Sequence, residues 1–288
     1  MMPRTARGNG LAVIGGLALT GLGAAAYNFL NNKQPDTTLT RLGFTPVQLQ
    51  QSQQLTHDVK RLTFQLDSDK KLGNYTSSAV LFRVTLPSGK TELRPYTPVS
   101  HELQRGSCDF VIKRYDDGQV SPALHDLEPG DKVEMWGPIP NFSYKPGEYT
   151  DIGMIAGGSG LTPMFQLINR VVNDPNDKTR ITLVFANKSK DDVFLKDQLD
   201  RFATQHPDKF KVHYVLTKAS EDWAGELGYV DREKIQKYMP PASTNSLIAV
   251  CGPPAMMRSV CGSKPNVMKQ GKLGGILKEL GYKNVYKF

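Results

Sequence analysis

The pattern of hydrophobic and polar side chains changes once along the chain. Between about residues 39 and 145, short stretches are apolar or alternate apolar with polar positions, as at residues 61–66 (RLTFQL), 79–86 and 109–115. Alternation at every second position predicts half-buried strands, and turn sequences such as PSGK and EPGD separate them. Several short strands at close spacing predict a small antiparallel barrel, with one short helix at residues 121–127.

After about residue 151 the pattern predicts alternating strands and helices. This alternation is typical of a parallel sheet with helices on both faces. Such sheets bind ligands at the carboxyl ends of their strands, where this chain places residues 157–162, 186–187 and 251–254. The predicted strands are residues 152–156, 181–186, 212–216 and 247–250, and the predicted helices are residues 162–173, 191–204, 231–238 and 273–280.

The first strand of this second half runs into a glycine turn, IAGGSGLTP. Gly157, Gly158 and Gly160 allow sharp turns and close approach to a ligand, because they carry no Cβ. Thr162 is suited to cap the following helix, and Pro163 suits its first turn. The segment lacks the G-x-G-x-x-G fingerprint, so a tight structural turn and a cofactor cradle both remain open interpretations. In the second interpretation the small residues provide clearance for stacked cofactor rings.

The N-terminal segment differs in kind from the rest. Before Asp36 the only charges are Arg4, Arg7 and Lys33, and residues 11–30 are uncharged and largely apolar. Twenty helical residues span about 30 Å, one hydrocarbon thickness, so we expect a single membrane anchor. A cleaved secretory signal ending near the run AAA and a mitochondrial presequence are the alternatives. The polar segment NNKQPDTT follows as a tether.

Composition narrows the class of protein. A chain of 288 residues suffices for two domains, and 39% hydrophobic and 22% charged residues are typical of a globular protein. The net charge of +8 is scattered, so we expect no nucleic-acid binding; an acidic protein partner or an anionic membrane explains the charge equally well. Cys108, Cys251 and Cys261 form no C-x-x-C pair, so we expect no metal site, no disulfide framework and a reducing compartment.

Four motifs occur in a fixed order along the chain: R-x-Y-T-x-x-S at residues 94–100, G-x-x-S at 118–121, G-G-x-G-x-T-P at 157–163 and C-G-P-P at 251–254. Together they resemble the ferredoxin–NADP reductase superfamily, and within it the NADH–cytochrome b5 reductases. The similarity covers about residues 39–288, and the joint order of the motifs makes it specific. The runs GPIPNFSY at 137–144 and GGILKELGYKNVYKF at 274–288, with the apolar N-terminus, resemble the fungal mitochondrial type.

The resemblance implies a two-domain β + α/β fold behind an N-terminal single membrane helix. Residues 1–38 would be the targeting or membrane anchor and tether. Residues 39–148 would form an FAD-binding antiparallel barrel of six strands. Residues 149–288 would form an NAD(P)H-binding α/β domain with a parallel sheet. We expect the protein to be a monomer.

The same resemblance implies flavin contacts in the barrel half. Arg94 would hold the flavin pyrophosphate, Tyr96 would pack against the isoalloxazine, and Thr97 would bond the ring edge. From the residues alone, a forked arginine contact to phosphate and a proline-stiffened strand end with an exposed Arg94 are equally good interpretations. The remaining implied flavin contacts are Pro95, Gly118, Val120 and Ser121.

For the nicotinamide cofactor, the resemblance implies that Thr162 and Cys251 lie by the nicotinamide and that Lys113, in an I-K-x-Y run, binds it. His57 would handle a proton. From the residues alone, a solvated strand lysine is the better interpretation of Lys113 and a structural histidine that of His57. Nothing in the sequence lowers the pKa of the Cys251 thiol enough to make it a nucleophile. The further implied cofactor contacts are Gly157, Gly158, Thr217, Gly252, Pro253 and Met256.

The resemblance implies a flavoprotein reductase that passes electrons from NADH through FAD to cytochrome b5 or a similar haem protein. Relatives carry an acid where Thr217 stands, and Lys218 follows it, so we expect NADPH to be tolerated. The implied location is the mitochondrial outer membrane, through a single-pass anchor, with a released intermembrane-space form as a variant. The alternatives are a reductase module for a different one-electron acceptor and an inactive, membrane-tethered basic binding protein.

Overall fold

The computed structural model describes residues 36–288 except residues 41, 87, 219–220 and 267–268. The predicted membrane anchor at residues 11–30 lies outside the described residues. Within the described part of the chain, no helix is both long and apolar enough to cross a bilayer.

The first half forms a six-stranded antiparallel sheet, as predicted. Its strand order is β4-β3-β6-β1-β2-β5, and every neighbouring pair is antiparallel. Phe64, Phe82 and Phe110 fill its core as edge-to-face pairs with ring centroids 4.7 to 6.0 Å apart. The strands are β1 (Thr45–Thr56), β2 (Val59–Gln65), β3 (Ser78–Thr85), β4 (Thr91–Tyr96), β5 (Ser107–Lys113) and β6 (Lys132–Pro140), with helix α2 (Val120–His125) after β5.

The run that follows β4 closes this sheet into a barrel. Pro98 forms an antiparallel bridge with Phe110 of β5. The Val99 amide donates to the Asp109 carbonyl at 2.8 Å, and the Asp109 amide donates to the Ser100 hydroxyl at 3.1 Å. The segment RPYTPVS is therefore both a candidate flavin site and the seam of the barrel.

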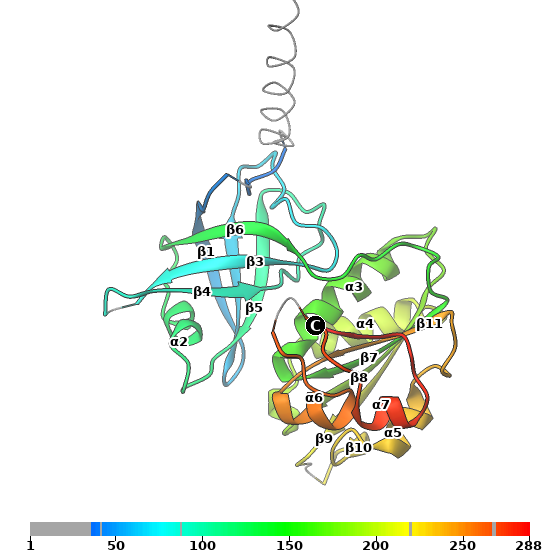
Figure 1. The fold of residues 1–288 in the computed structure, drawn as a ribbon. Helices are drawn as coiled ribbons and strands as arrows, with labels where there is room; N and C mark the ends of the chain where they lie inside the picture. Colours follow the sequence, from blue (N-terminus) through cyan, green and yellow to red (C-terminus); the bar gives the residue numbers. More distant parts are fainter. Residues whose placement is uncertain (1–35, 41, 87, 219–220, 267–268) are drawn as a thin grey trace, which may run out of the picture. The chain divides into compact units, whose positions relative to one another are not determined.

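The second half forms a six-stranded sheet in which all pairs are parallel, with the order β10-β9-β8-β7-β11-β12 (Figure 1). The strands are β7 (Asp151–Gly157), β8 (Arg180–Asn187), β9 (Phe210–Leu216), β10 (Glu226–Leu227), β11 (Ser246–Cys251) and β12 (Val285–Lys287). The helices are α3 (Leu161–Asn173), α4 (Lys196–Gln205), α5 (Arg232–Tyr238), α6 (Pro254–Val260) and α7 (Gly275–Glu279), with the 3-10 turns η1 (Gly158–Gly160) and η2 (Lys190–Asp192).

Both faces of this sheet are buried, which explains why its strands are apolar runs without alternation. On β7, Met154 belongs to the cluster formed with α3 and α4. The next residue, Ile155, belongs to the cluster formed with α5, α6 and α7. Helices therefore cover both faces, as the sequence pattern predicted.

Chain order places a topological switch point at the centre of this sheet. From β7 the chain moves outward through β8 and β9, and it later returns to β11 on the other side of β7. At the carboxyl ends of these strands Cys251 is paired with Ala156, and Gly157 with Ala186. All three predicted strand-end features therefore meet at one edge, where such sheets bind ligands.

Two predictions about helix starts were wrong. Residues 191–204 do not form one helix, because Leu195 adopts a left-handed conformation with φ of 57° and α4 begins only after it. This turn buries both Phe194 and Leu195. Thr162 does not cap α3 either: the cap residue is Gly160, and no side chain satisfies the cap.

Candidate cofactor and electron-transfer site

The glycines of the switch point mainly accommodate protein. A Cβ on Gly160 would overlap the backbone carbonyl of Cys251, and one on Gly157 would lie 2.9 Å from Pro253 and Met256. The β7–α3 turn therefore packs directly against the β11–α6 turn. Only Gly158, with φ of +50°, has open space where a Cβ would lie. Clearance for a ligand is thus supported at Gly158, whereas Gly157 and Gly160 serve the packing of the two turns.

This turn also contacts the barrel. The Thr162 hydroxyl donates to the Ser159 carbonyl at 3.2 Å, and the Ser159 hydroxyl shares a 2.6 Å hydrogen bond with the Tyr115 hydroxyl. Tyr115 follows β5 of the barrel. The switch point of the nucleotide sheet therefore lies beside the barrel half that carries the predicted flavin residues.

Arg94 and Tyr96 occupy β4 with different surroundings. Arg94 is exposed and donates to Glu92 at 3.0 Å and to the Leu93 carbonyl at 2.8 Å, both through one terminal nitrogen. Tyr96 is half-buried and packs edge-on against Phe82 at 5.1 Å, and burial raises its pKa to about 12. The exposed guanidinium of Arg94 is suited to bind a pyrophosphate, and the fixed ring of Tyr96 beside it is suited to pack against a flavin.

The turn before α2 is organised by side chains that point into the protein. Val120 is buried in the barrel core, and the Ser121 hydroxyl accepts from the Tyr115 amide at 3.0 Å. A Cβ on Gly118 would lie 3.1 Å from the Tyr115 carbonyl. These residues can therefore contact a pyrophosphate only through their backbone N–H groups.

Lys113 lies in an ion-pair cluster between barrel and nucleotide domain. Its ammonium lies 2.5 Å from Asp58 of the barrel and 3.4 Å from Asp192 of η2. Burial lowers the Lys113 pKa, but the two carboxylates outweigh it and the net shift is upward. The solvated-lysine interpretation is therefore wrong. His57 lies 3.5 Å from Asp58 and 3.9 Å from Asp192, but its side chain is exposed.

Asp192 was predicted, with Asp191, to begin the helix at residues 191–204, but it lies in the 3-10 turn η2 before α4. Its carboxylate accepts from the Ser189 amide and hydroxyl at 3.0 and 2.7 Å, in a capping box. Its pairing with Lys113 was missed, because 79 residues separate the two and no sequence signal relates them. The His57, Asp58 and Asp192 ligand atoms lie close enough for a metal ion, but both carboxylates are already paired with the Lys113 ammonium.

The three cysteines are free thiols. Burial raises the pKa of Cys251 to about 12, although the positive charge of Lys264 acts in the opposite direction. Cys251 is therefore a neutral thiol near pH 7, as expected for a residue that shapes a pocket. Cys108 and Cys261 are buried, and burial raises the pKa of Cys261 to about 11.

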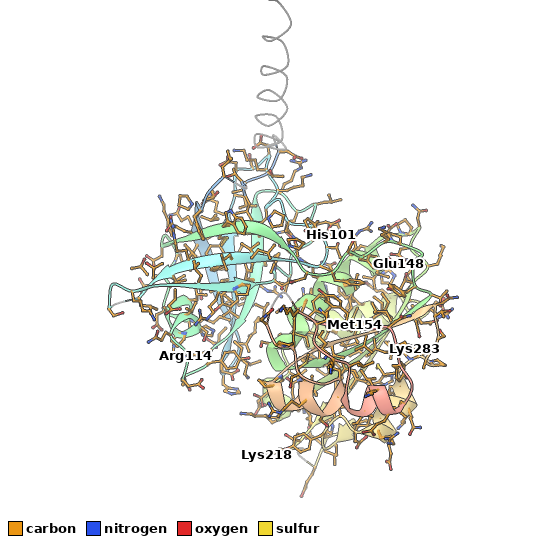
Figure 2. All side chains as sticks on the ribbon, in the orientation of Figure 1. His101, Arg114, Glu148, Met154, Lys218 and Lys283 are labelled. Carbon is orange, nitrogen blue, oxygen red and sulfur yellow. The ribbon has the colours of Figure 1, made fainter. Side chains whose placement is uncertain are left out.

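Thr217 lies two strands from β7, after the end of β9. Its amide donates to the Asn187 carbonyl at 3.1 Å, and its hydroxyl donates to the Lys188 carbonyl at 3.3 Å. Lys218 follows and is exposed (Figure 2). This end of the sheet therefore presents a hydroxyl and an ammonium, with no carboxylate at either position.

The family comparisons identify the two halves. Residues 46–144 match the oxidoreductase FAD-binding domain, and residues 154–262 match the oxidoreductase NAD-binding domain. The fold is similar to the cytochrome b5 reductase domain of Ulva prolifera nitrate reductase, with a TM-score of 0.78, 30% identity, and coverage of 88% of this chain and 99% of that one. The protein is thus an oxidoreductase that uses FAD and a nicotinamide cofactor.

Curated relatives define the family more narrowly. The chain is 36% identical to NADH-cytochrome b5 reductase 2 of Lodderomyces elongisporus over 282 residues, which cover 96% of this chain and 94% of the relative. It is 40% identical to the Neurospora crassa protein of the same name over 251 residues, covering 85% and 73%. The chain belongs to the NADH-cytochrome b5 reductase family, which confirms the resemblance of its motifs.

Proposed function

We propose that the protein carries electrons from NADH through FAD to cytochrome b5. The observation that carries this proposal is the contact between the two cofactor domains: the hydrogen bond between the Ser159 and Tyr115 hydroxyls holds the switch point of the nucleotide sheet beside the barrel. A dinucleotide in that crevice has its reactive end next to a flavin held on β4. Bound FAD supplies hydride acceptance and the release of single electrons, which a haem acceptor requires.

The barrel residues hold and orient the flavin. Arg94, which now donates to Glu92, would hold the pyrophosphate with its guanidinium group, and Pro95 would stiffen the strand at that point. Tyr96 offers a half-buried ring that cannot ionise near pH 7, because burial raises its pKa to about 12. Thr97 bonds the ring edge. Gly118, Val120 and Ser121 add backbone N–H groups.

The nucleotide residues set the approach of the nicotinamide. Thr162 and Cys251 would flank it, and Gly157, Gly252, Pro253 and Met256, which pack on one another, would support that position. Lys113 would bind the cofactor from the barrel side by exchanging one of its two carboxylate partners, Asp58 or Asp192, for a group of the cofactor. His57 exchanges its proton directly with solvent, because 61% of its side chain is exposed.

The full-length protein purified in detergent provides the test. We expect a yellow protein whose flavin absorbance is bleached by NADH and restored by oxidised cytochrome b5. Bleaching without restoration would indicate a different one-electron acceptor. A colourless protein that binds no added FAD would indicate the inactive binding protein.

We propose further that discrimination against NADPH is weak. The hydroxyl of Thr217 and the ammonium of Lys218 do not repel a 2′-phosphate, whereas a carboxylate would. We expect the ratio of kcat/KM for NADH over NADPH to stay below about a thousandfold, which corresponds to ~4 kcal/mol. The variant Thr217→Asp should raise this ratio at least about tenfold, with Thr244→Asp on an exposed loop as control. A wild-type ratio above this limit would contradict the proposal.

We also propose a single-pass N-terminal anchor in the mitochondrial outer membrane. The support is the uncharged run at residues 11–30 after a basic, acid-free start. Protease protection on intact organelles tests the topology. Alkaline extraction tests the anchor, and a released intermembrane-space form would appear as a shorter soluble species.

A further inference from the structure

The C-terminal strand β12 secures the loop formed by residues 262–273. Lys287 is only 2% exposed, and its ammonium donates to the carbonyls of Ser263 at 3.2 Å and Lys272 at 2.8 Å. Gln270 bonds both backbone groups of Lys287, at 3.0 and 2.7 Å. Within the described residues no carboxylate pairs with this buried cation. Its hydrogen bonds therefore serve to hold the two ends of the loop together.

Strand register sets the place of this loop. Lys287 is paired with Val250 of β11, directly before Cys251. The secured end of the loop, Ser263, therefore lies near the carboxyl end of β11, and Lys264 follows it. The charges of Lys264 and Cys251 influence each other's pKa, which is consistent with this proximity.

Lys264 differs from the other two lysines of this loop, Lys269 and Lys272, which are exposed. Its side chain is half-buried, and burial lowers its pKa. Among the described residues it has neither an ion pair nor a hydrogen bond to its ammonium. A desolvated ammonium without a partner at a ligand-binding edge is suited to receive a group of the ligand.

The two ends of a dinucleotide are distinguishable at this edge. The β7–α3 turn contacts the barrel through Ser159 and abuts Cys251 through Gly160, so the hydride-donating ring must lie there. Thr217 lies two strands away, about 10 Å at the usual spacing, and suits the adenosine end. Lys264, near Cys251, therefore lies at the nicotinamide end of the dinucleotide and not at its adenosine end.

We propose that Lys264 is a cofactor-binding residue that favours reduced over oxidised nicotinamide dinucleotide; this rests on the proposed function. Its ammonium donates to the carboxamide oxygen of the neutral dihydronicotinamide. The same charge repels the cationic ring of NAD⁺. Lys264 thus promotes both binding of the electron donor and release of the product.

Lys264→Met in the full-length holoenzyme tests this inference. We expect the Kd for NAD⁺, measured from the flavin difference spectrum, to fall and the KM for NADH to rise, so that their ratio shifts by about tenfold. The Kd for ADP-ribose, which has both phosphates and no nicotinamide, should stay unchanged. Lys264→Arg keeps the charge and should preserve the wild-type ratio. Lys269→Met is the matched control.

An equal change for NADH, NAD⁺ and ADP-ribose would overturn the inference, since it would place Lys264 at the phosphates or give it a structural role. Unchanged binding of all three would overturn it as well. Thermal unfolding of each variant shows whether the fold persists, and Lys264→Gln replaces Lys264→Met if it does not. Bleaching of the wild-type flavin by NADH tests the proposed function separately.

Discussion

Gly158 and Gly160 lie two residues apart in one turn, but their surroundings predict different costs of substitution. A Cβ on Gly160 would overlap the Cys251 backbone, which cannot move without shifting β11. We expect Gly160→Ala to lower the free energy of unfolding by about 3 kcal/mol. The Cβ of Gly158→Ala would contact no atom, so the only cost is the left-handed backbone conformation. We expect this to lower the free energy of unfolding by about 1–2 kcal/mol. Urea unfolding of the holoprotein measures both, and equal losses would contradict this account.

Local motifs were predictable from the sequence, whereas contacts between distant residues were not. The RPYTPVS and CGPP segments were recognisable because their residue types are tied to a local backbone. Lys113 gave no local sign of its pairing with Asp192, because that contact forms only when the barrel and the nucleotide domain meet. Lys264 was missed for a similar reason: its neighbour Ser263 is held by a hydrogen bond from Lys287, which lies far along the chain.

At the scale of elements, α2 predicts a pH dependence of stability. His125 at its end is buried, and its Nε2 lies 2.8 Å from the Ile112 carbonyl of β5. Burial is the main cause that lowers its pKa below the ordinary 6.5; Lys60 and Arg114 add to the shift, and the Ile112 carbonyl and Asp126 oppose it. The folded protein therefore binds this proton less readily than the unfolded chain does.

The consequence is a loss of stability on acidification. Below about pH 6.5 the unfolded chain gains the His125 proton first, so the free energy of unfolding falls as pH decreases toward the folded pKa. We expect His125→Gln, which keeps a donor for the Ile112 carbonyl, to flatten this part of the profile. Urea unfolding between about pH 7 and pH 5 measures it. His206→Gln, at the half-buried C-cap of α4, is the control, and an unchanged slope in His125→Gln would refute the assignment.

Strands were predictable where the side chains on one face, or on both faces, were consistently apolar. Strands β2, β3, β5 and β7 were placed within two residues of their observed ends. β1 was missed because its sequence TPVQLQQSQQLT has few apolar positions, and most of its side chains are exposed or half-buried. The short strands β10 and β12 depend on pairing with the finished sheet, which no local pattern reports, and helix α6 was missed as well.

At the scale of the whole molecule, net charge sets the rate of encounter with an acidic partner. Three of the eight net charges come from Arg4, Arg7 and Lys33, which leaves +5 on residues 36–288. The Debye length falls from about 30 Å at 0.01 M to about 8 Å at 0.15 M ionic strength, so long-range attraction of an acidic haem protein weakens over this range. Attraction of this kind acts on the association rate more than on the chemistry.

We therefore expect kcat/KM for cytochrome b5 to fall by about tenfold or more over this range of ionic strength. The kcat should change little, because the cofactors and the residues that hold them remain in place. Reduction of a neutral quinone by the same protein is the control, since salt has no charge–charge attraction to screen between protein and quinone. A rate with cytochrome b5 that is as independent of salt as the quinone rate would show that the basic surface does not steer this partner. The charge would then be explained by the alternative that composition left open, an anionic membrane surface, and binding to vesicles with and without anionic lipid would separate the two.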